Sequence, residues 1–356
     1  MFSAETLKDE LSTLIEGAIA DRIFPGGVVA VVSGRDHVCL PFGRETYEAA
    51  APSLSADSIF DLASLTKVIA TTTAIMQCIE RDQLALDQVI DDIVPELGPA
   101  SMNRIEIRHL MSHMAGFAGI TPFYEKCRTR DELLEEAFKL KLAYQPGTGR
   151  IYDDVSFIIL GMVIERVSGQ AFDHYCTERI FARLGMTETT FCPDPRLSTR
   201  LVPTEVDPVR GGLVRGFVHD ENAYLMGGVA GHAGLFATAG DVARFCSNVI
   251  AGGPDRRRIL SDASLRQLRE LQWRDEDGEY GLGWDRFRRS YMGDIGDPEA
   301  IGHTGFTGTS IVISPTYEFA IILLTNRVHP QRSDRARINE TRRAVAGVVA
   351  RHVLRA

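Results

Sequence analysis

The sequence predicts an α/β (α+β) fold in which one antiparallel sheet combines strands from both ends of the chain. Runs of β-branched and other apolar residues occur near the N-terminus and again near the C-terminus, and such runs are typical of strands. The middle of the chain is mainly helical and loop-like in pattern. We therefore expect a sheet flanked by the terminal helices, with a large, mainly helical region inserted between its two halves.

Periodicity and turn residues define the first elements. Residues 4–21 carry leucine, isoleucine and alanine at helical spacing, and Pro25-Gly26-Gly27 ends this pattern. Residues 28–33 and 37–41 are short apolar runs separated by a turn, which predicts a β-hairpin. The further predicted elements are helices at 64–81, 154–168 and 335–354 and strands at 309–314 and 319–325.

These elements divide the chain into two parts. We assign residues 1–60 and 285–356 to the sheet with its terminal helices, and residues 61–284 to the mainly helical region. Ligand sites often lie where two such parts meet, so the active site is expected between them.

Charge and composition exclude several classes of binding protein. The 356 residues include 39 basic and 48 acidic side chains, which give a net charge of −9. Nucleic acids and anionic membranes do not attract such a chain, because their own fields are negative. Local basic runs at 256–258 and 342–343 are interpreted as solvated surface. The sequence does not predict an oligomeric state.

Cysteine spacing and the N-terminus bear on the cellular compartment. The six cysteines are scattered and form no C-x-x-C pair, so we expect reduced thiols rather than a zinc ribbon or a disulfide framework. Residues 1–24 lack the basic segment and apolar stretch of a signal peptide. No apolar run reaches the roughly 18 residues that a membrane-spanning helix needs. We therefore expect a cytoplasmic protein.

The stretch FDLASLTKVIATTTAIMQ (60–77) places a serine and a lysine three residues apart at the start of a predicted helix. Positions i and i+3 share one helix face, so Ser64 and Lys67 present a hydroxyl and an amine to the same space. Unpaired N–H groups at a helix start can stabilise an oxyanion. These are the groups that acyl transfer requires. S-x-x-K by itself is a weak signal, and a capping serine beside a solvated lysine is the alternative.

Two further motifs follow in order along the chain. Tyr152-Asp153-Asp154 opens the helix at 154–168, and His303-Thr304-Gly305 begins a glycine-rich run before a strand. Together with S-x-x-K, they resemble the S-x-x-K, Y-x-N and K-T-G or H-T-G motifs of the serine β-lactamase and penicillin-binding-protein superfamily, most closely its class C-like esterase branch. The stretches IEIRHLMSHMAGF, GVAGHAGLFATAGDVARF and YGLGW are also similar to family segments, so the resemblance covers most of the chain.

The resemblance implies a β-lactamase-like fold and a role for each matching residue. Ser64 matches the acylated nucleophile, Lys67 its basic partner, and Tyr152 the tyrosine that carries the proton to and from the leaving group. His303 occupies the lysine position of K-T-G. The backbone N–H groups of Ser64 and Phe306 would form the oxyanion hole. The other expected substrate contacts are Asp154, Thr304 and Gly305.

Two positions depart from the family pattern. Asp154 stands where the family usually has asparagine, so an amide donor is replaced by an acceptor. His303 replaces a permanent cation by a ring with an ordinary pKa of about 6.5, which is mostly neutral at pH 7. Both changes are expected to weaken recognition of an anionic β-lactam or peptide carboxylate, and to leave acyl transfer intact.

The remaining histidines offer other interpretations. His219 and His232 lie in glycine-rich, loop-like sequence, and we consider both as candidate substrate contacts. His109 and His113 are spaced i, i+4 and could hold a metal. The glutamate of H-E-x-x-H is missing and no third ligand is evident, so packing or hydrogen bonding is preferred and no metal is expected.

The absence of two common motifs restricts the kinds of reaction that the sequence predicts. The sequence contains no G-x-S-x-G and no G-x-G-x-x-G after a predicted strand, which argues against an α/β-hydrolase elbow and a dinucleotide cofactor. We predict a cofactor-independent serine hydrolase that cleaves small ester substrates through an acyl-enzyme. The alternatives are an amidase or peptidase acting on cell-wall muropeptides, a weak β-lactamase or D-alanyl-D-alanine carboxypeptidase, and a non-catalytic binding protein of the same fold.

Overall fold

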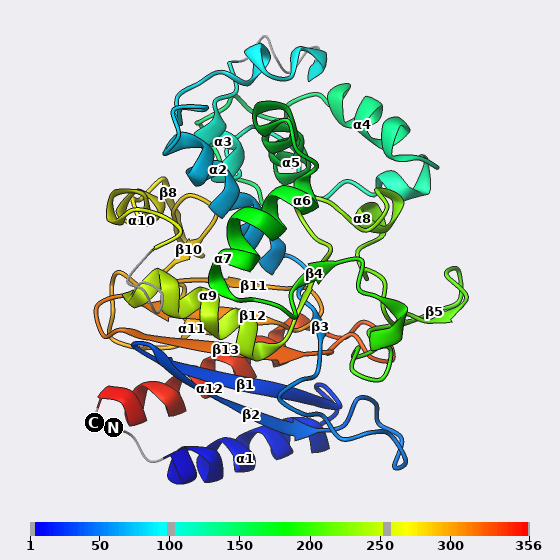
Figure 1. Cartoon of the computed structure of the whole chain (residues 1–356), viewed down its shortest axis with the longest axis vertical. Coiled ribbons are helices and arrows are strands. Elements are labelled where there is room, and N and C mark those ends of the chain that lie inside the picture. Colours follow the sequence, from blue (N-terminus) through cyan, green and yellow to red (C-terminus); the bar gives the residue numbers. More distant parts are fainter. Residues whose placement is uncertain (1–3, 98–103, 252–257, 355–356) are drawn as a thin grey trace.

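A large antiparallel sheet organises the molecule (Figure 1). The computed structural model describes residues 4–97, 104–251 and 258–354. The eight strands lie in the order β2-β1-β13-β12-β11-β10-β9-β8, and every neighbouring pair is antiparallel. The strands are β1 (Gly26–Ser33), β2 (Asp36–Gly43), β8 (Trp273–Asp275), β9 (Gly278–Tyr280), β10 (Asp285–Arg286), β11 (Ile301–Thr304), β12 (Ser310–Ser314) and β13 (Phe319–Thr325).

The two ends of the chain meet in this sheet, which confirms the predicted fold class. The N-terminal hairpin β1–β2 pairs with the C-terminal strand β13. The helices α1 (Ala4–Ala20) and α12 (Arg335–Leu354) pack against each other on one face of the sheet. Figure 1 shows both helices on the same side of the sheet.

Strands β1 and β13 are buried on both faces, because alternate side chains enter two different cores. Val29 and Val31 belong to the core beneath α1 and α12, and Val29 pairs with Leu323 in the neighbouring strand. Val28 and Ala30 point the other way, into the core shared with the inserted helical region. The sheet is therefore a layer between two sets of helices, and both strands read as nearly continuous apolar runs.

The inserted region carries most of the remaining elements. Two small sheets occur there, formed by β3 (Phe60–Asp61), β7 (Leu235–Ala237) and β4 (Thr190–Phe191), and by β5 (Val206–Asp207) and β6 (Gly212–Leu213). Its helices are α2 (Thr73–Ile79), α3 (Ile107–Met111), α4 (Arg130–Phe138), α5 (Val155–Ser168), α6 (Phe172–Cys176), α7 (Ala182–Leu184), α8 (Glu221–Leu225), α9 (Ala239–Ala251) and α10 (Asp262–Leu268). The short helix α11 (Arg289–Met292) follows β10.

The C-terminal part of the sheet begins before the predicted boundary at residue 285, since β8 and β9 already belong to the sheet. The division of the chain at 60 and 285 stays a proposal about domains. The local predictions are confirmed at 4–21, in the hairpin, and at 335–354. The predicted helix at 154–168 is α5, which ends at Gly169 with φ 68°, a conformation that glycine adopts without steric cost.

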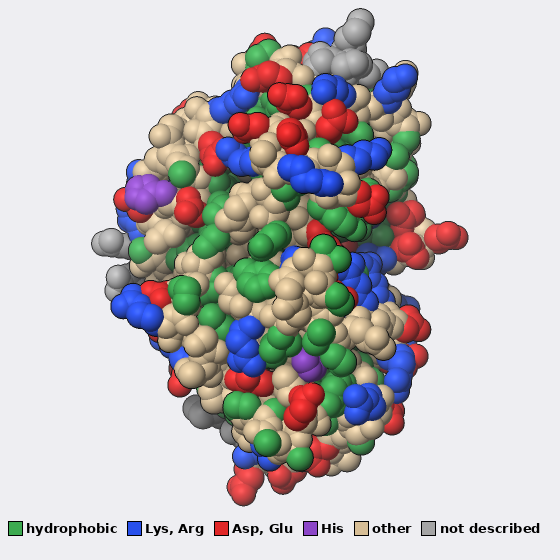
Figure 2. All heavy atoms as spheres, turned by 90° about the vertical axis from the view of Figure 1, so that its right-hand side faces the viewer, with side chains coloured by type: hydrophobic (Ala, Val, Ile, Leu, Met, Phe, Trp, Pro, Cys, Tyr) green, Lys and Arg blue, Asp and Glu red, His purple; other side chains and the backbone are tan. Residues whose placement is uncertain are grey.

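Surface properties agree with the composition. All six cysteines are free, as expected for reduced thiols. Figure 2 shows acidic and basic side chains intermingled on the side of the molecule that bears β5 and α8. Among the described residues no single helix is long and apolar enough to cross a membrane, although α5 and the segment Phe172–Leu184, bent by 77°, meet the length and composition requirement as a pair.

Candidate active site

A cavity of about 740 Å³ lies between the inserted region and the β11 side of the sheet. The residues that line it extend along the sequence from the turn after β3 to α12. Most of the predicted site residues meet there, although they are spread over some 240 positions of the sequence. The predicted residues that line the cavity are Ser64, Tyr152, Asp154, His219, His303, Thr304, Gly305 and Phe306.

Ser64 occupies a strained turn between β3 and the following helix. The preceding residue, Ala63, has a φ of 48°, which is unusual for a residue other than glycine. The Asp61 carboxylate accepts a hydrogen bond from the Ala63 N–H at 2.8 Å. The hydroxyls of Thr307 and Thr309 donate to the carbonyls of Asp61 and Leu62 at 2.8 and 3.0 Å. The turn is thus stabilised by its own Asp61 side chain and by two threonines that follow β11.

Gly305 allows the strand side to approach this turn closely. A Cβ atom at that position would lie 2.6 Å from the Leu62 carbonyl oxygen and 2.0 Å from the Thr309 hydroxyl. Any larger residue would push β11 away from Ser64. Steric contact therefore explains why the third residue of the His303-Thr304-Gly305 motif is glycine.

The helix after Ser64 starts with an unusual turn. Leu65 and Thr66 are helical, and a π-helical segment, η1 (Lys67–Thr72), leads into α2. Such π-turns occur often at functional sites. The predicted helix at 64–81 is therefore confirmed as a helical segment, with Ser64 in the turn just before its first residue.

Lys67 is fully buried and makes three polar contacts. Its Nζ atom lies 2.7 Å from Asp154 Oδ1, 3.1 Å from Ser64 Oγ and 3.1 Å from the His232 carbonyl oxygen. An ammonium group has three N–H donors, and here each one has an acceptor. The geometry therefore fits the cationic form of Lys67, and the amine predicted beside Ser64 is in place.

The charge of Lys67 is set mainly by Asp154. Burial by itself would lower the pKa of the Lys67 amine, but the adjacent Asp154 carboxylate more than offsets this and raises the pKa above its usual value. The departure from asparagine at position 154 thus has a clear consequence, because it replaces a neutral neighbour by an anion in a buried ion pair.

Tyr152 lies between the lysine and two histidine rings. Its ring centroid is 5.1 Å from Lys67 Nζ, 4.5 Å from the His113 ring and 6.2 Å from the His303 ring. Its hydroxyl interacts with Ser64 and Lys67. Burial raises the pKa of the phenol despite the nearby ammonium, so the resting site holds Tyr152 as a proton donor.

His303 is buried on β11, and its environment differs from the expected one. Burial, and then the charge of Lys67 and the proximity of His113, lower the pKa of His303 well below 6.5. The prediction of a pKa near 6.5 is therefore wrong for this ring, because the sequence does not show its burial. His303 is a neutral group throughout the physiological range.

His109 and His113 do not share one site. His109 Nδ1 accepts a hydrogen bond from the Glu106 N–H at the start of α3. His113 lies 3.3 Å from Asp153 and packs against Tyr152. Each ring thus has a hydrogen-bonding or packing role, as preferred from the sequence.

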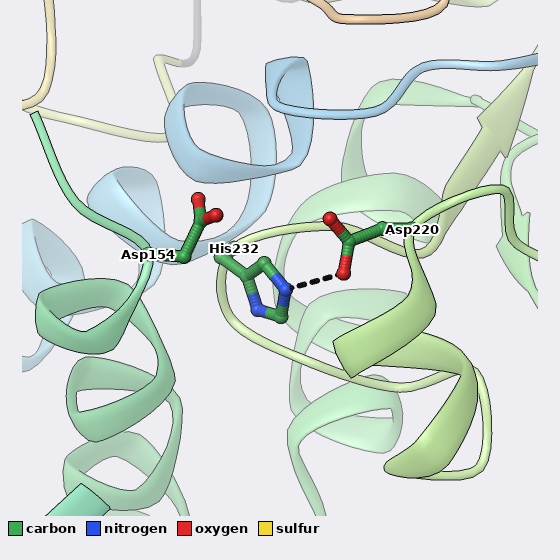
Figure 3. A group of neighbouring side chains, drawn as sticks. All are labelled: Asp154, Asp220 and His232. Carbon is green, nitrogen blue, oxygen red and sulfur yellow. Dashed lines mark hydrogen bonds and ion pairs between the residues drawn. The ribbon is translucent and has the colours of Figure 1, made fainter. Parts of the chain in front are cut away.

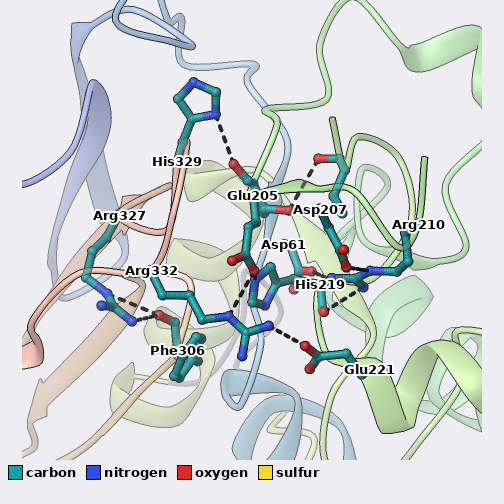
Figure 4. A network of polar contacts seen from close by, with 12 residues as sticks. Asp61, Glu205, Asp207, Arg210, His219, Glu221, Phe306, Arg327, His329 and Arg332 are labelled. Carbon is teal, nitrogen blue, oxygen red and sulfur yellow. Dashed lines mark hydrogen bonds and ion pairs between the residues drawn. The ribbon is translucent and has the colours of Figure 1, made fainter. Parts of the chain in front are cut away.

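His219 lines the cavity within a network of polar contacts (Figure 4). Its backbone N–H donates to Asp61 at 2.7 Å, its Nε2 lies 2.8 Å from Glu205, and its ring stacks on Phe306 at 5.7 Å. Glu205 in turn accepts a hydrogen bond from Arg332 at 2.9 Å. This network connects the Ser64 turn to Phe306.

His232 contributes differently, since its ring is fully buried and does not line the cavity. Its carbonyl oxygen contacts Lys67, and its Nε2 lies 2.9 Å from Asp220 (Figure 3). Burial opposes ionisation of Asp220, but the His232 ring lowers the pKa of Asp220 below its usual value. The observed contacts of His232 are therefore with Lys67 and with Asp220, and its own ring does not border the cavity.

Asp154, Asp220 and His232 form a group that could hold a cation, because their ligand atoms lie within 4.8 Å of one another. The ammonium of Lys67 already contacts Asp154 and the His232 carbonyl. A divalent cation between these residues would be repelled by this ammonium. The positive charge at this place is thus supplied by the chain itself.

The expected oxyanion donors border the same cavity. The backbone of Ser64 precedes the helix, and Phe306 follows Gly305 in the turn after β11. Within the described residues neither N–H group donates a hydrogen bond to the fold. Both are therefore free to bind an oxygen that develops negative charge.

Comparison with known proteins shows the family of this chain. A family model described as Beta-lactamase matches residues 11–346. The chain belongs to the Beta-lactamase family. A relative from Escherichia coli (strain K12), named "Putative D-alanyl-D-alanine carboxypeptidase", is 32% identical over 308 residues, which are 78% of this chain and 71% of that protein.

Solved structures share the fold of this chain. A "Beta-Lactamase/D-Alanine Carboxypeptidase" from Pseudomonas syringae aligns with a TM-score of 0.78, 20% identity, and coverage of 96% of this chain and 99% of that chain. EstCE1, "a hydrolase with promiscuous acyltransferase activity", aligns with a TM-score of 0.77, 19% identity, and coverage of 95% and 99%. The family and its fold place this chain among the serine hydrolases of the β-lactamase and penicillin-binding-protein type.

The sequence patterns did not identify several residues of the Beta-lactamase-type site. Asp61 and Asp220 act through contacts that arise only on folding. The arginines Arg327, Arg332 and Arg335 line the cavity from the C-terminal segment. Their clustering after the last strand was an available signal, but no spacing rule connects them to Ser64.

The interpretation of 342–343 as solvated surface is wrong for Arg342. This side chain is buried and donates to the carbonyls of Gly305 and Thr309 at 3.0 and 2.7 Å. Positions 335, 338, 339 and 342 share the face of α12 that lines the cavity, whereas Arg343 is exposed. Two adjacent arginines on a helix point in different directions. The run at 256–257 lies outside the described residues.

We expect Ser64 to be the residue that a fluorophosphonate probe labels, because it combines a cavity position with a nearby base and free N–H donors. Intact-mass measurement should show one adduct, and Ser64→Ala should remove it. Ser290→Ala is the matched control, since Ser290 also lines the cavity and its loss should leave the adduct unchanged. An adduct that persists in Ser64→Ala would contradict the assignment.

The lowered pKa of His303 predicts that its ring stays neutral between pH 6 and 8. Nuclear magnetic resonance of ¹⁵N-labelled histidine should show constant ring nitrogen shifts for His303 in this range, with the signal assigned through His303→Gln. A protonation step of the His303 ring inside this window would show that burial does not govern it.

Proposed function

We propose that the protein is a serine hydrolase that cleaves small esters through an acyl-enzyme on Ser64. The observation that carries this proposal is the position of Ser64 Oγ on the cavity wall, 3.1 Å from the buried Lys67 amine. Tyr152 beside both residues, and the free N–H groups of Ser64 and Phe306, supply the other elements of acyl transfer. No cofactor takes part in this proposed reaction.

The proposed sequence of steps follows the contacts. In the fraction of molecules in which Lys67 is neutral, Ser64 attacks the carbonyl carbon as its proton passes to the Lys67 amine. The N–H groups of Ser64 and Phe306 stabilise the oxyanion. The alcohol leaves after receiving a proton from Tyr152 or Lys67, and water then releases the acyl group by the reverse path.

Asp154 controls how readily this reaction begins. A lysine acts as a base only in the fraction that is neutral, and Asp154 keeps Lys67 cationic. Nucleophile activation is therefore the demanding step, while proton donors for the leaving group are abundant. Esters are the favoured substrates because their carbonyl is more electrophilic than that of an amide.

A second candidate is an amidase that acts on D-alanyl peptides, including cell-wall muropeptides. The names of the relatives support it, and so does the presence of two proton donors, since an amine leaving group needs protonation. Turnover of 4-nitrophenyl acetate, of a peptide ending in D-alanyl-D-alanine and of nitrocefin by one preparation would rank the ester, amide and β-lactam candidates.

The proton path predicts the effect of two substitutions. Lys67→Ala and Tyr152→Phe should each lower kcat for 4-nitrophenyl acetate by about 10²–10⁴-fold, the usual range for loss of general acid–base catalysis. Circular dichroism of each variant should confirm folding, because Lys67→Ala leaves Asp154 buried without its partner. Near-normal turnover by either folded variant would rule out the proposed path.

Asp154→Asn tests the control of Lys67 directly. Removal of the carboxylate should lower the pKa of Lys67, because the anion now raises it and burial opposes it. The rise of kcat/KM with pH should therefore move to lower pH in this variant. Asp153→Asn is the matched control, since Asp153 contacts His113 and Ser156 and not Lys67. The idea fails if both variants keep the wild-type pH profile.

A further inference from the structure

His113 contacts three consecutive residues of the chain, 151–153, which we call the tyrosine segment. The Tyr152 ring packs on the His113 ring, with 4.5 Å between the ring centres. The residue before it, Ile151, donates its backbone N–H to the His113 carbonyl at 3.3 Å. The residue after it, Asp153, donates its backbone N–H to His113 Nδ1 at 3.3 Å. One residue therefore contacts the tyrosine of the proposed proton path and both of its neighbours in the sequence.

Two further side chains strengthen these contacts. The Tyr144 hydroxyl donates to the His113 carbonyl at 3.2 Å and accepts from the Ile151 N–H at 3.0 Å. The Asp153 carboxylate lies 3.3 Å from His113 Nδ1 and accepts from the N–H and the hydroxyl of Ser156 at 2.6 and 3.0 Å. Ser156 belongs to the first turn of the buried helix α5. The tyrosine segment is thus attached to His113 on one side and to α5 on the other.

The backbone of His113 adopts a strained conformation. Its φ is 59°, a value that residues other than glycine adopt at an energetic cost. The side chain is only 3% exposed. Burial lowers the pKa of the His113 ring despite the nearby Asp153 carboxylate, so the ring is neutral and adds no charge beside the Lys67 ammonium. Strain of this kind persists only where many contacts enforce it, and the contacts of His113 converge on the tyrosine segment.

The position of the Tyr152 hydroxyl matters because it interacts with both Ser64 and Lys67. Proton transfer requires donor and acceptor atoms about 2.6–3.2 Å apart. A misplacement of about 1 Å can lower a rate by about 10²-fold. Lys67 Nζ lies 5.1 Å from the centre of the Tyr152 ring, and the His113 ring is packed against the same phenol. The support of this ring therefore determines how accurately its hydroxyl is placed.

An imidazole at position 113 combines two properties that the tyrosine segment uses. It offers a flat face to the Tyr152 ring and a nitrogen acceptor to the Asp153 N–H. Phenylalanine would keep the face and lose the acceptor. Asparagine would keep an acceptor and tolerate the positive φ, but it would lose the face. The two contacts of His113 can therefore be removed separately.

We propose that His113 is a positioning residue that holds the Tyr152 hydroxyl where it protonates the leaving group. This inference rests on the proposed function and adds a residue to it. As the bond between the carbonyl carbon and the leaving oxygen breaks, Tyr152 gives its proton to that oxygen and receives one from the Lys67 ammonium. Substrates whose leaving group needs a proton therefore depend on His113 more than substrates whose leaving group is stable as an anion.

Two acetates test this dependence. Benzyl acetate releases an alkoxide that needs a proton, whereas 4-nitrophenyl acetate releases a phenolate that does not. His113→Asn should lower kcat/KM for benzyl acetate by about 10²-fold, the loss that a misplaced hydroxyl can cause, and kcat/KM for 4-nitrophenyl acetate much less. In a Tyr152→Phe background the same substitution should have little further effect, because no hydroxyl remains to be positioned. Equal losses for the two acetates, or additive losses in the double variant, would overturn the proposal.

His109→Asn is the matched control, because it makes the same substitution four residues earlier, where the ring accepts a hydrogen bond from the Glu106 N–H. It should leave the ratio of the two kcat/KM values unchanged. Circular dichroism should confirm that each variant folds. If His113→Asn does not fold, His113→Phe takes its place, since it keeps a ring against Tyr152 and removes only the acceptor. It should change the ratio in the same direction to a smaller extent, and an unchanged ratio in the variant that folds contradicts the proposal.

Fluorine nuclear magnetic resonance of the full chain labelled with 3-fluorotyrosine separates this inference from the proposed function, because it needs no substrate. The Tyr152 signal, assigned by its loss in Tyr152→Phe, should be one sharp line in the wild type and in His109→Asn. It should broaden or divide in His113→Asn as the ring gains a second position. If neither acetate is hydrolysed but the signal changes in this way, the proposed function fails and the positioning of Tyr152 stands. If the acetates are hydrolysed and neither their ratio nor the signal responds to His113→Asn, the positioning fails and the hydrolase stands.

Discussion

The buried ammonium of Lys67 is the point on which the site depends. It connects three segments that are far apart in the sequence: the turn with Ser64, the start of α5 at Asp154, and the loop with His232. A charge removed from water is costly unless it is paired and hydrogen-bonded. The contacts of Lys67 satisfy all its donors, so the packing of these segments and the chemistry of Ser64 are set by the same group.

This arrangement gives the site an unusual protonation state. The ion pair with Asp154 favours the cation at Lys67, burial favours the neutral phenol at Tyr152, and burial with nearby charge favours the neutral ring at His303. Donors of protons are therefore plentiful beside Ser64 and acceptors are scarce. An asparagine at position 154 would reverse part of this balance, because it would leave the lysine buried without an anion.

The opposite wall of the cavity is shaped by the ends of the chain. Strand β11 approaches the Ser64 turn because Gly305 has no side chain, and Thr307 and Thr309 hold the two together. Helix α12 lies behind this turn through Arg342 and presents Arg335 at its first residue. The same helix thus supports the turn that carries Phe306, whose N–H group belongs to the proposed oxyanion hole.

The sequence by itself determined the elements whose signal is local. The hairpin at β1–β2, the terminal helices and the buried helix α5 follow from apolar periodicity and from Pro and Gly at their ends, and the three motifs identified Ser64, Lys67, Tyr152 and the His303 strand. Tertiary structure decided what depends on burial and on distant neighbours. The pKa of His303, the burial of Arg342 beside an exposed Arg343, and the contact of His232 through its carbonyl all arise from packing between segments. The residue type determines which charge a side chain can carry. Whether the side chain carries that charge depends on its burial and on its nearest partner, and both are fixed only when the chain folds.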